Sequence, residues 1–476
     1  MKTLLVFPAL RSIYGIPNYP PLGLSYLSAS LSKSRIEHDV IDLRLYSNWE
    51  DKFTKKISEG FDIVGITATT FGFDQVEKLA RIIKEISPNS LVVLGGAHPT
   101  LINDKILKKN KNIDFIIVGE GEHAIVELCQ SITKKLDLKK IKGLIFRKGD
   151  KVTSNINGFW NCDLDNLPFP DYDKFNLNEY HGDTSFTGII KKRKILPILT
   201  SRGCPFECIY CSVYLASGNI FRVRSPENVV NEIEFMKKKY NAGIFDFLDD
   251  NFTLDVERAK KICKLIIDKK LKIQWGPPNG IRVDKIDEEL VKLMKKSGCN
   301  GIALGIESVD DNVLKKLKKH TTFKQIENAV YLFKKHKIPI KAFFLIGSPG
   351  GSKEEVKKSF EFAFKNKIEE ARFSMLTPYP GTELFNWVTK NKYWITKQPE
   401  IDIIKYTHEG SLKSLYEEPS FTSTEKEKVY AYVSKRWKKH EEKGNLSLKI
   451  RRYIISNDIL YKILKGLRDK LKNSLS

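Results

Sequence analysis

The first part of the chain alternates short apolar runs with amphipathic segments. Continuous runs of Val, Ile and Leu are typical of strands that are buried on both faces of a parallel sheet. The predicted strands are Lys2–Phe7, His38–Asp42, Ile63–Thr67, Leu91–Gly95 and Ile113–Val118, and the predicted helices between them are Leu22–Ser32, Asp74–Ile86 and Glu122–Thr133. This alternation predicts an α/β fold with a doubly wound, Rossmann-like domain over residues 1–135.

A second alternation of the same kind begins near Ile195, after a connecting segment, 136–193, that contains the turn-forming stretch Asn166–Asp173. Six strands are predicted, at Ile195–Thr200, Ile244–Leu248, Lys272–Trp275, Gly301–Gly305, Ile340–Ile346 and Ala371–Met375. Six βα units predict a partial, TIM-like (β/α)6 barrel over residues 194–390. Pro197 suits its first strand, because proline is tolerated on the edge strand of an open barrel.

The βα rhythm ends near Lys390, and residues 391–476 are predicted to form a basic helical extension. Residues 425–476 hold 15 Lys and Arg against 6 Asp and Glu, a net charge of +9 within a chain of net charge +23. Apolar positions from Ile450 to Leu471 recur at helical spacing. Such a helix either lies on an anionic membrane surface or packs on the barrel. Nucleic acid is a third partner, but no RNA-binding fold signature accompanies the charge.

The cysteines and the hydropathy indicate a reducing, cytoplasmic location. Seven cysteines are an odd number in a long chain, which argues against a disulfide framework. No apolar run approaches the roughly 20 residues that span a bilayer, and Met1–Phe7 is too short for a signal peptide. Cys129, Cys162, Cys263 and Cys299 stand singly and are interpreted as core thiols.

The other three cysteines, Cys204, Cys208 and Cys211, share a CxxxCxxC spacing directly after the first predicted barrel strand. Three thiolates within eight residues can hold three irons of a [4Fe–4S] cluster and leave the fourth iron open, whereas the common four-cysteine sites close every iron. A zinc site would favour paired CxxC motifs and a fourth Cys or His at a matching distance. The sequence offers neither.

This loop, including the aromatic Tyr210, resembles the cluster loop of the radical S-adenosylmethionine (radical SAM) enzymes. The resemblance implies that the open iron binds SAM and that the reduced cluster cleaves SAM to a 5′-deoxyadenosyl radical. This radical takes a hydrogen atom from an unactivated C–H bond. It places SAM contacts at predicted strand ends, where barrel active sites lie. These candidates are Tyr210, Asp249, Asp250, Arg282, Glu307, Ser308 and Gly347. For Arg282 a salt bridge to Asp284 or Asp287 is an equal alternative.

The N-terminal domain resembles the cobalamin-binding domain that precedes many radical SAM domains. The motifs are Pro20-Pro-Leu-Gly-Leu24, Gly95-Gly-Ala-His-Pro-Thr100 and Gly119-Glu-Gly-Glu122. The resemblance implies cobalamin contacts from Thr67, Thr69, Thr70, Gly95, Gly96, His98 and Glu120. The DxHxxG motif that supplies an axial histidine to cobalt in other cobalamin proteins is absent, so no histidine ligand is expected from it. His98 is interpreted as a corrinoid contact or a turn residue.

These resemblances together predict an enzyme of the branch that includes cobalamin-dependent radical SAM methyltransferases and anaerobic magnesium-protoporphyrin cyclases. The expected reaction is hydrogen abstraction followed by cobalamin-linked methyl transfer to a small, hydrophobic substrate, with an external electron donor. A non-methylating cyclase, oxidoreductase or carbon–carbon coupling enzyme acting on a lipid or tetrapyrrole is the alternative. A non-enzymatic, metal-containing RNA-binding protein remains a third interpretation.

Overall fold

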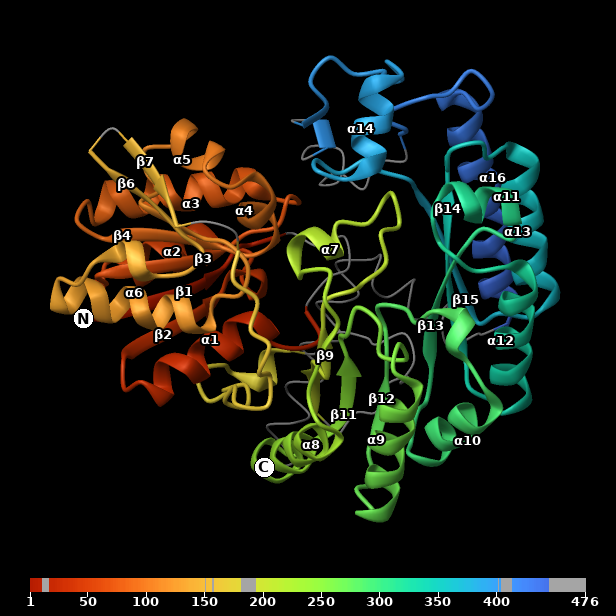
Figure 1. Cartoon of the computed structure of the whole chain (residues 1–476), viewed down its shortest axis with the longest axis horizontal. Coiled ribbons are helices and arrows are strands. Elements are labelled where there is room, and N and C mark those ends of the chain that lie inside the picture. The colour runs from red at the N-terminus through yellow and green to blue at the C-terminus, as the bar shows by residue number, and fades with distance from the viewer. Residues whose placement is uncertain are drawn as a thin grey trace, which may run out of the picture.

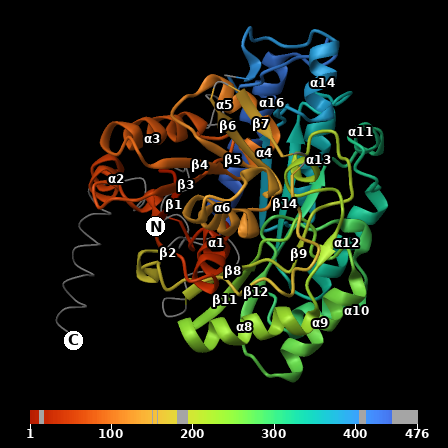
Figure 2. The same cartoon turned by 60° about the vertical axis from the view of Figure 1, so that its left-hand side comes forward.

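The computed structural model describes residues 1–10, 17–149, 151–155, 158–180, 194–400, 402–403 and 413–444. Two α/β parts lie side by side: an N-terminal sheet with its helices, and a barrel-like part that carries the cysteine loop (Figure 1). Helix α1 (Leu22–Lys33) lies against the first strands of the barrel (Figure 2), where its Leu22 and Tyr26 share a hydrophobic core with Leu196.

The N-terminal sheet has seven strands in the order β2-β1-β3-β4-β5-β6-β7. The strands are β1 (Lys2–Phe7), β2 (Glu37–Asp42), β3 (Ile63–Thr67), β4 (Leu91–Gly95), β5 (Phe115–Ile117), β6 (Leu144–Lys148) and β7 (Lys151–Ser154). The first five are parallel, as predicted. Strand order reverses between β1 and β3, and ligands of such sheets bind beyond the carboxyl ends of the strands at that point.

The hairpin β6–β7 was not predicted. It pairs antiparallel to β5 and continues the sheet to Ser154, past the predicted limit of the first unit at residue 135. Its residues fell in the predicted linker, because two strands of five and four residues without a helix between them do not show the βα rhythm. The division of the chain at residues 135, 193 and 390 stays a prediction.

Helices cover both faces of this sheet because successive β1 side chains point to opposite sides. Leu5 packs with Leu24 of α1 and with Ile125 of helix α6 (Glu122–Lys134), whereas Leu4 and Val6 face the core on the other side of the sheet. The helices besides α1 are α2 (Trp49–Ile57), α3 (Phe73–Ile86), α4 (Ala97–Ile102), α5 (Lys105–Lys109) and α6 (Glu122–Lys134). The sequence prediction missed α2, α4 and α5, and α4 begins inside the predicted turn 95–100.

The barrel has the six predicted strands, all parallel, in two sheets of order β12-β11-β8 and β13-β14-β15. The strands are β8 (Lys194–Ile198), β11 (Ala242–Phe247), β12 (Gln274–Gly276), β13 (Ile302–Glu307), β14 (Ile340–Ile346) and β15 (Glu370–Met375). Two isolated parallel β-bridges, Trp275–Cys299 and Ile281–Leu304, connect the two sheets through their backbones. The partial (β/α)6 barrel is therefore confirmed, with Pro197 on its edge strand.

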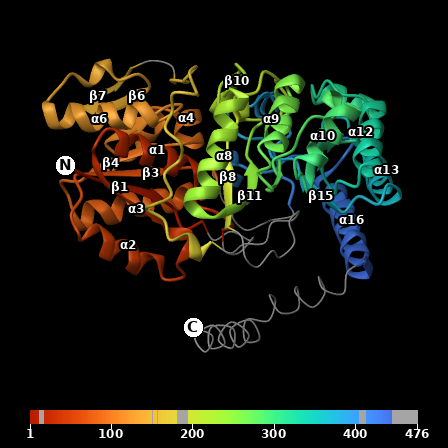
Figure 3. The same ribbon diagram turned by 90° about the horizontal axis from the view of Figure 1, so that it is seen from below.

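Helices follow one another around the outside of the barrel (Figure 3). They are α8 (Pro226–Tyr240), α9 (Val256–Asp268), α10 (Glu288–Lys296), α11 (Asp311–Lys316), α12 (Phe323–Lys335) and α13 (Lys353–Lys365). The Ser225 side chain caps α8, and Thr322 caps α12 in a capping box with Gln325. Shorter elements are β9 (Ser201–Arg202), β10 (Arg222–Val223), α7 (Val213–Ala216) and the 3₁₀ turns Leu43–Leu45, Leu138–Lys140, Leu177–Glu179 and Val283–Lys285.

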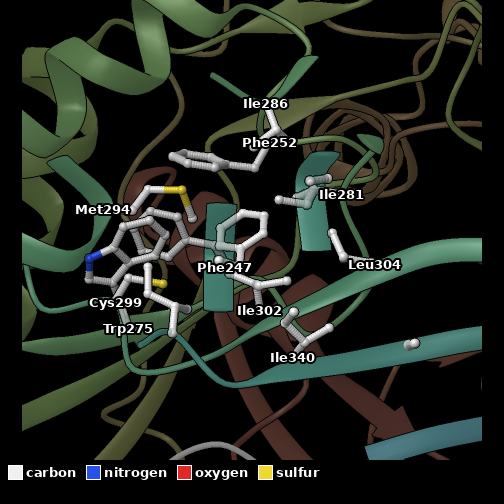
Figure 4. Packing of buried hydrophobic residues seen from close by; sticks show 14 of the residues in the cluster. Phe247, Phe252, Trp275, Ile281, Ile286, Met294, Cys299, Ile302, Leu304 and Ile340 are labelled. Atoms are coloured by element: carbon white, nitrogen blue, oxygen red, sulfur yellow. The ribbon is translucent and has the colours of Figure 1, made fainter. Parts of the chain in front are cut away.

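Aromatic and aliphatic side chains between the barrel strands and their helices form the largest core (Figure 4). Trp275 is fully buried, and its ring stacks on Phe247 at 4.6 Å and meets Phe252 edge-on at 5.5 Å. Its indole Nε1 donates a hydrogen bond to Ser297 Oγ at 3.1 Å. The one polar atom of this large ring is thus satisfied inside the core.

Trp275→Ala is expected to lower the free energy of unfolding by about 3–5 kcal/mol, because it leaves a large cavity in the core. Urea unfolding followed by circular dichroism measures the loss. Tyr331→Ala, at a side chain that is 61% exposed, is the control and should change little. A loss at Trp275 no larger than that of the control would contradict the packing described here.

The connecting segment is anchored to both parts of the molecule. Tyr172 is buried, its backbone N–H donates to Tyr240 Oη at 3.2 Å, and its hydroxyl donates to the Pro197 carbonyl at 3.3 Å. The backbone N–H of Asp171 donates to the Ser25 carbonyl on α1 at 3.0 Å. The segment therefore ties α1 to the barrel.

After the barrel come α14 (Glu383–Lys390) and α16 (Ser423–Gly444), and α16 packs against α13 and β15. The predicted amphipathic stretch from Ile450 to Leu471 lies outside the described residues. Among the helices that are described, none combines the length and the apolar character required to cross a bilayer.

Candidate active site

A cavity of about 400 Å³ lies between the N-terminal sheet and the barrel. The N-terminal side contributes the carboxyl ends of β3 and β4, the Gly119–Glu122 turn and helix α1, and the barrel side contributes Leu199, Arg202, Leu248 and Asp250. Of the predicted cobalamin contacts, Thr67, Gly95, Gly96 and Glu120 line it. This is the edge at which a doubly wound sheet binds ligands.

An apolar extension of this cavity runs under helices α1 and α6, where Leu5, Leu24 and Ile125 line it. Gly65, in the middle of β3, keeps this space open: a Cβ there would lie 3.3 Å from Leu5 Cδ2. At the mouth, Gly96 has φ +101°, and a Cβ would lie 2.8 Å from the Ala68 carbonyl oxygen. The cavity shape thus depends on two positions without a side chain.

Three predicted cobalamin contacts do not line this cavity. Thr69 is exposed and donates to the Phe71 carbonyl at 2.7 Å, while Thr70 Oγ1 and His98 Nδ1 are hydrogen-bonded at 3.1 Å. His98 is buried against the Phe73 ring, with 4.1 Å between ring centroids, and burial lowers its pKa to about 4. His98 is therefore a neutral side chain that packs below the turn.

We predict that His98→Ala leaves the number of nitrogen ligands on protein-bound cobalt unchanged, since the imidazole is directed into the core. Electron paramagnetic resonance of the Co(II) form reports axial nitrogen through its hyperfine splitting. Loss of such a splitting in His98→Ala would show that the ring turns into the cavity and binds the metal.

Glu120 is held by an ion-pair network across the two parts. It contacts Arg202 at 3.2 Å and Arg222 at 2.7 Å, and Glu122 contacts Arg202 at 2.7 Å. All four side chains are at most 11% exposed. Removing one member of such a buried network typically costs about 3–5 kcal/mol. Glu120 thus fixes the cavity wall in addition to facing the cavity.

The cysteine loop leaves the barrel after β8 and is closed at its base by the antiparallel pair β9–β10. Gly203, directly before Cys204, has φ +85°, and a Cβ would lie 2.3 Å from the Ile220 carbonyl oxygen. Within the loop, the Cys204 N–H donates to the Gly218 carbonyl at 3.2 Å and the Cys211 N–H to the Cys208 carbonyl at 2.9 Å. Backbone hydrogen bonds therefore direct the cysteines to one side.

All three cysteines line a second cavity, of about 350 Å³, at the carboxyl ends of the barrel strands. Burial raises the pKa of Cys204, and burial together with the neighbouring thiols raises that of Cys211 to about 12. A thiol in such a setting becomes a thiolate only when positive charge, such as iron, accompanies it. Among the described residues no three metal-binding side chains converge on one point; a cubane does not require this, because each cysteine binds a different iron.

Four of the predicted SAM contacts line the cysteine cavity, namely Tyr210, Asp250, Arg282 and Glu307. Arg282 also forms the alternative salt bridge, with Nε 2.8 Å from Asp284 Oδ1, and its guanidinium lies 3.7 Å from the Phe206 ring centroid. Asp250 lines both cavities, the only described residue that appears in the walls of both.

The other three predicted SAM contacts do not line this cavity. Asp249 accepts hydrogen bonds from the Thr200 N–H and hydroxyl at 3.1 and 2.6 Å and from the Ser201 hydroxyl. Ser308 donates to Glu355. The Gly347 carbonyl accepts from the Tyr416 hydroxyl, and the Lys426 side chain from α16 covers the glycine. These groups have protein partners.

Asn251 and Lys319 line the cysteine cavity and were missed by the sequence analysis. Neither polar atom of the Asn251 amide has a hydrogen-bond partner in the described part of the protein, although the residue is 1% exposed. An orphaned buried amide fits a polar cofactor that would pair with it. For Asn251, the only signal in the sequence was its position directly after Asp249-Asp250. Lys319 could not be distinguished by sequence from the other lysines of the Lys315-Lys-Leu-Lys-Lys319 stretch.

Comparisons with known proteins find matches for both the N-terminal part and the barrel. Residues 17–129 match the B12 binding domain model and residues 198–363 the radical SAM superfamily model. The chain is 35% identical to an uncharacterized methyltransferase of Pyrococcus horikoshii over 83% of this chain and 85% of that one. It is 30% identical to the anaerobic magnesium-protoporphyrin IX monomethyl ester cyclase of Cereibacter sphaeroides, over 79% of this chain and 63% of the cyclase. The radical SAM methyltransferase TsrM of Kitasatospora setae shares the fold, with a TM-score of 0.68 and 20% sequence identity. The match covers 82% of this chain and 75% of the TsrM chain.

The fold and the cysteine loop thus define an iron–sulfur enzyme with a corrinoid-binding domain. The chain belongs to the radical SAM superfamily, in the branch with an N-terminal B12-binding domain. Its cofactors are a [4Fe–4S] cluster, SAM and cobalamin, which confirms the prediction from the sequence motifs. Its substrate is a small molecule, as for the enzymes it resembles.

Proposed function

We propose that this protein methylates a carbon atom of its substrate. The supporting observation is the arrangement of the two cavities, which meet at Asp250 alone among the described residues. A substrate at this junction reaches both cofactors. When bound, the cluster and SAM supply a 5′-deoxyadenosyl radical that removes a hydrogen atom, and the corrinoid supplies a methyl group.

The residues divide between the two cavities. Cys204, Cys208 and Cys211 hold the cluster, and five further polar residues of that cavity orient SAM: Tyr210, Asp250, Asn251, Arg282 and Glu307. Thr67, Gly95, Gly96 and Glu120 line the corrinoid cavity. Asp249, Ser308 and Gly347 support the barrel loops through their protein hydrogen bonds. The ion pairs of Arg202 and Arg222 with Glu120 keep the two cavities in register.

Anaerobic expression with iron and cobalamin, followed by an assay for 5′-deoxyadenosine after addition of SAM and dithionite, tests this function. We expect cobalt, about four irons per chain for one cubane, and deoxyadenosine. Label from methyl-labelled SAM should then reach the substrate. Iron and deoxyadenosine without cobalt would instead favour cyclase or oxidoreductase chemistry, which the similarity to the magnesium-protoporphyrin cyclase keeps as the second candidate.

A hydrophobic substrate, such as a tetrapyrrole or lipid, is part of this proposal. It is supported by the apolar wall of the inter-domain cavity and by the tetrapyrrole named for the cyclase relative. The basic C-terminal extension would then bring the enzyme to an anionic membrane surface. Binding of the full-length protein and of a variant without residues 446–476 to anionic liposomes tests the membrane contact. If neither protein bound the liposomes, this contact would be excluded. An external one-electron donor completes the proposed set of partners.

A further inference from the structure

Lys319 and Glu307 form a buried ion pair in the wall of the cysteine cavity. Lys319 Nζ lies 2.9 Å from Glu307 Oε1, and both side chains are 9% exposed. The same ammonium lies 3.4 Å from the Tyr210 hydroxyl. Gly305 makes room for the pair, because a Cβ there would lie 2.9 Å from Glu307 Oε1 and 3.0 Å from Lys319 Nζ.

The segment that carries Lys319 is attached to the cysteine loop. The N–H of Ile209, next to Cys208, donates to the Leu317 carbonyl at 3.2 Å, and the N–H of Lys319 donates to the Leu314 carbonyl at 3.0 Å. Ile209, Leu317 and Val313 also share one small core. The distance between the ammonium and the cysteines is therefore set by the fold.

Lys319 keeps its charge in this position. Burial acts against the ammonium form, but the ion pair with Glu307 outweighs it and raises the pKa of Lys319. The other cation of the cavity, Arg282, has its own carboxylate partner in Asp284. Lys319 lines the same cavity as the three cysteines, on the segment that the Ile209–Leu317 hydrogen bond ties to Cys208.

The reduction potential of an iron–sulfur cluster depends on nearby charge, hydrogen bonds to sulfur and exposure. An electron added to the cluster is stabilised by a positive charge at short range and opposed by a negative one, and both effects are strong where water is excluded. We propose that the Lys319–Glu307 pair sets the reduction potential of the cluster, with Lys319 favouring the one-electron-reduced form and Glu307 opposing it. This positioning role rests on cluster binding but is independent of methyl transfer.

The test is a potentiometric titration of the cluster, followed by electron paramagnetic resonance in the absence of SAM, with dithionite as the reductant. Lys319→Met should shift the midpoint to a more negative potential, and Glu307→Gln should shift it to a more positive one. Lys319→Arg keeps the charge and should stay near the wild-type value. Because SAM is left out, a contact of Glu307 with SAM contributes nothing to the shift.

The double variant Lys319→Met/Glu307→Gln avoids an unpaired buried charge and should return the midpoint toward that of the wild type. Damage to the loop would move the single variants in the same direction, together with a loss of iron. Shifts of equal sign, or unchanged midpoints in protein with full iron content, would overturn the proposal. Wild-type protein that binds no cluster would instead contradict the cofactor assignment itself.

Discussion

Cys208→Ala is expected to abolish 5′-deoxyadenosine formation and to remove most of the iron. Cys208 is the most buried of the three loop cysteines, and its neighbour Ile209 is hydrogen-bonded to Leu317 on one side, while the Leu384 N–H donates to the Ile209 carbonyl on the other. The position is thus held by the fold, and among the described residues no fourth cysteine lines this cavity. Iron analysis and the deoxyadenosine assay measure the two losses.

Cys162→Ala is the matched control for this prediction. Cys162 is exposed in the connecting segment, so its interpretation as a core thiol was wrong, and it lines neither cavity. Iron content and deoxyadenosine should therefore stay at wild-type values. Cys208→Ala protein that keeps about four irons and full activity would show that the cluster is bound elsewhere.

Gly65→Val is expected to reduce cobalamin binding at least tenfold while leaving the iron content unchanged. A Cβ at this position already lies 3.3 Å from Leu5, and the two further methyl groups of valine would fill the apolar extension between β3 and α1. Valine suits a buried parallel strand, so the sheet should still form. Tenfold in affinity corresponds to about 1.4 kcal/mol, which lies within the usual cost of about 1–3 kcal/mol for overpacking.

Gly23→Ala is the control, because Gly23 also lines the cavity but a Cβ there meets no atom within 4 Å. Titration of the apoprotein with cobalamin, followed by absorption, should give wild-type affinity for Gly23→Ala. If Gly65→Val also bound cobalamin with wild-type affinity, the corrinoid would not use this extension.

Much of the fold could be predicted from the sequence because its signals are local. The continuous apolar runs gave β1, β3 and β4 with the observed bounds, since both faces of a parallel strand are buried. Side-chain caps at Ser225 and Thr322 act within one turn of helix. The hairpin β6–β7 was missed because its place depends on pairing with β5, and its own strands are too short to stand out.

The candidate site, too, could be predicted from the sequence only in part. By itself, the sequence determined the cysteine loop, the cofactor class and the cavity residues next to motifs, such as Gly95 and Glu120, because spacing within a loop is a local property. Only the tertiary structure decided that Asp250 faces both cavities while Asp249 binds Thr200. It also buried Lys319 beside Glu307 while Lys318 stays exposed. Burial and pairing arise between segments far apart in the chain, so identical residue types at adjacent positions acquire different roles.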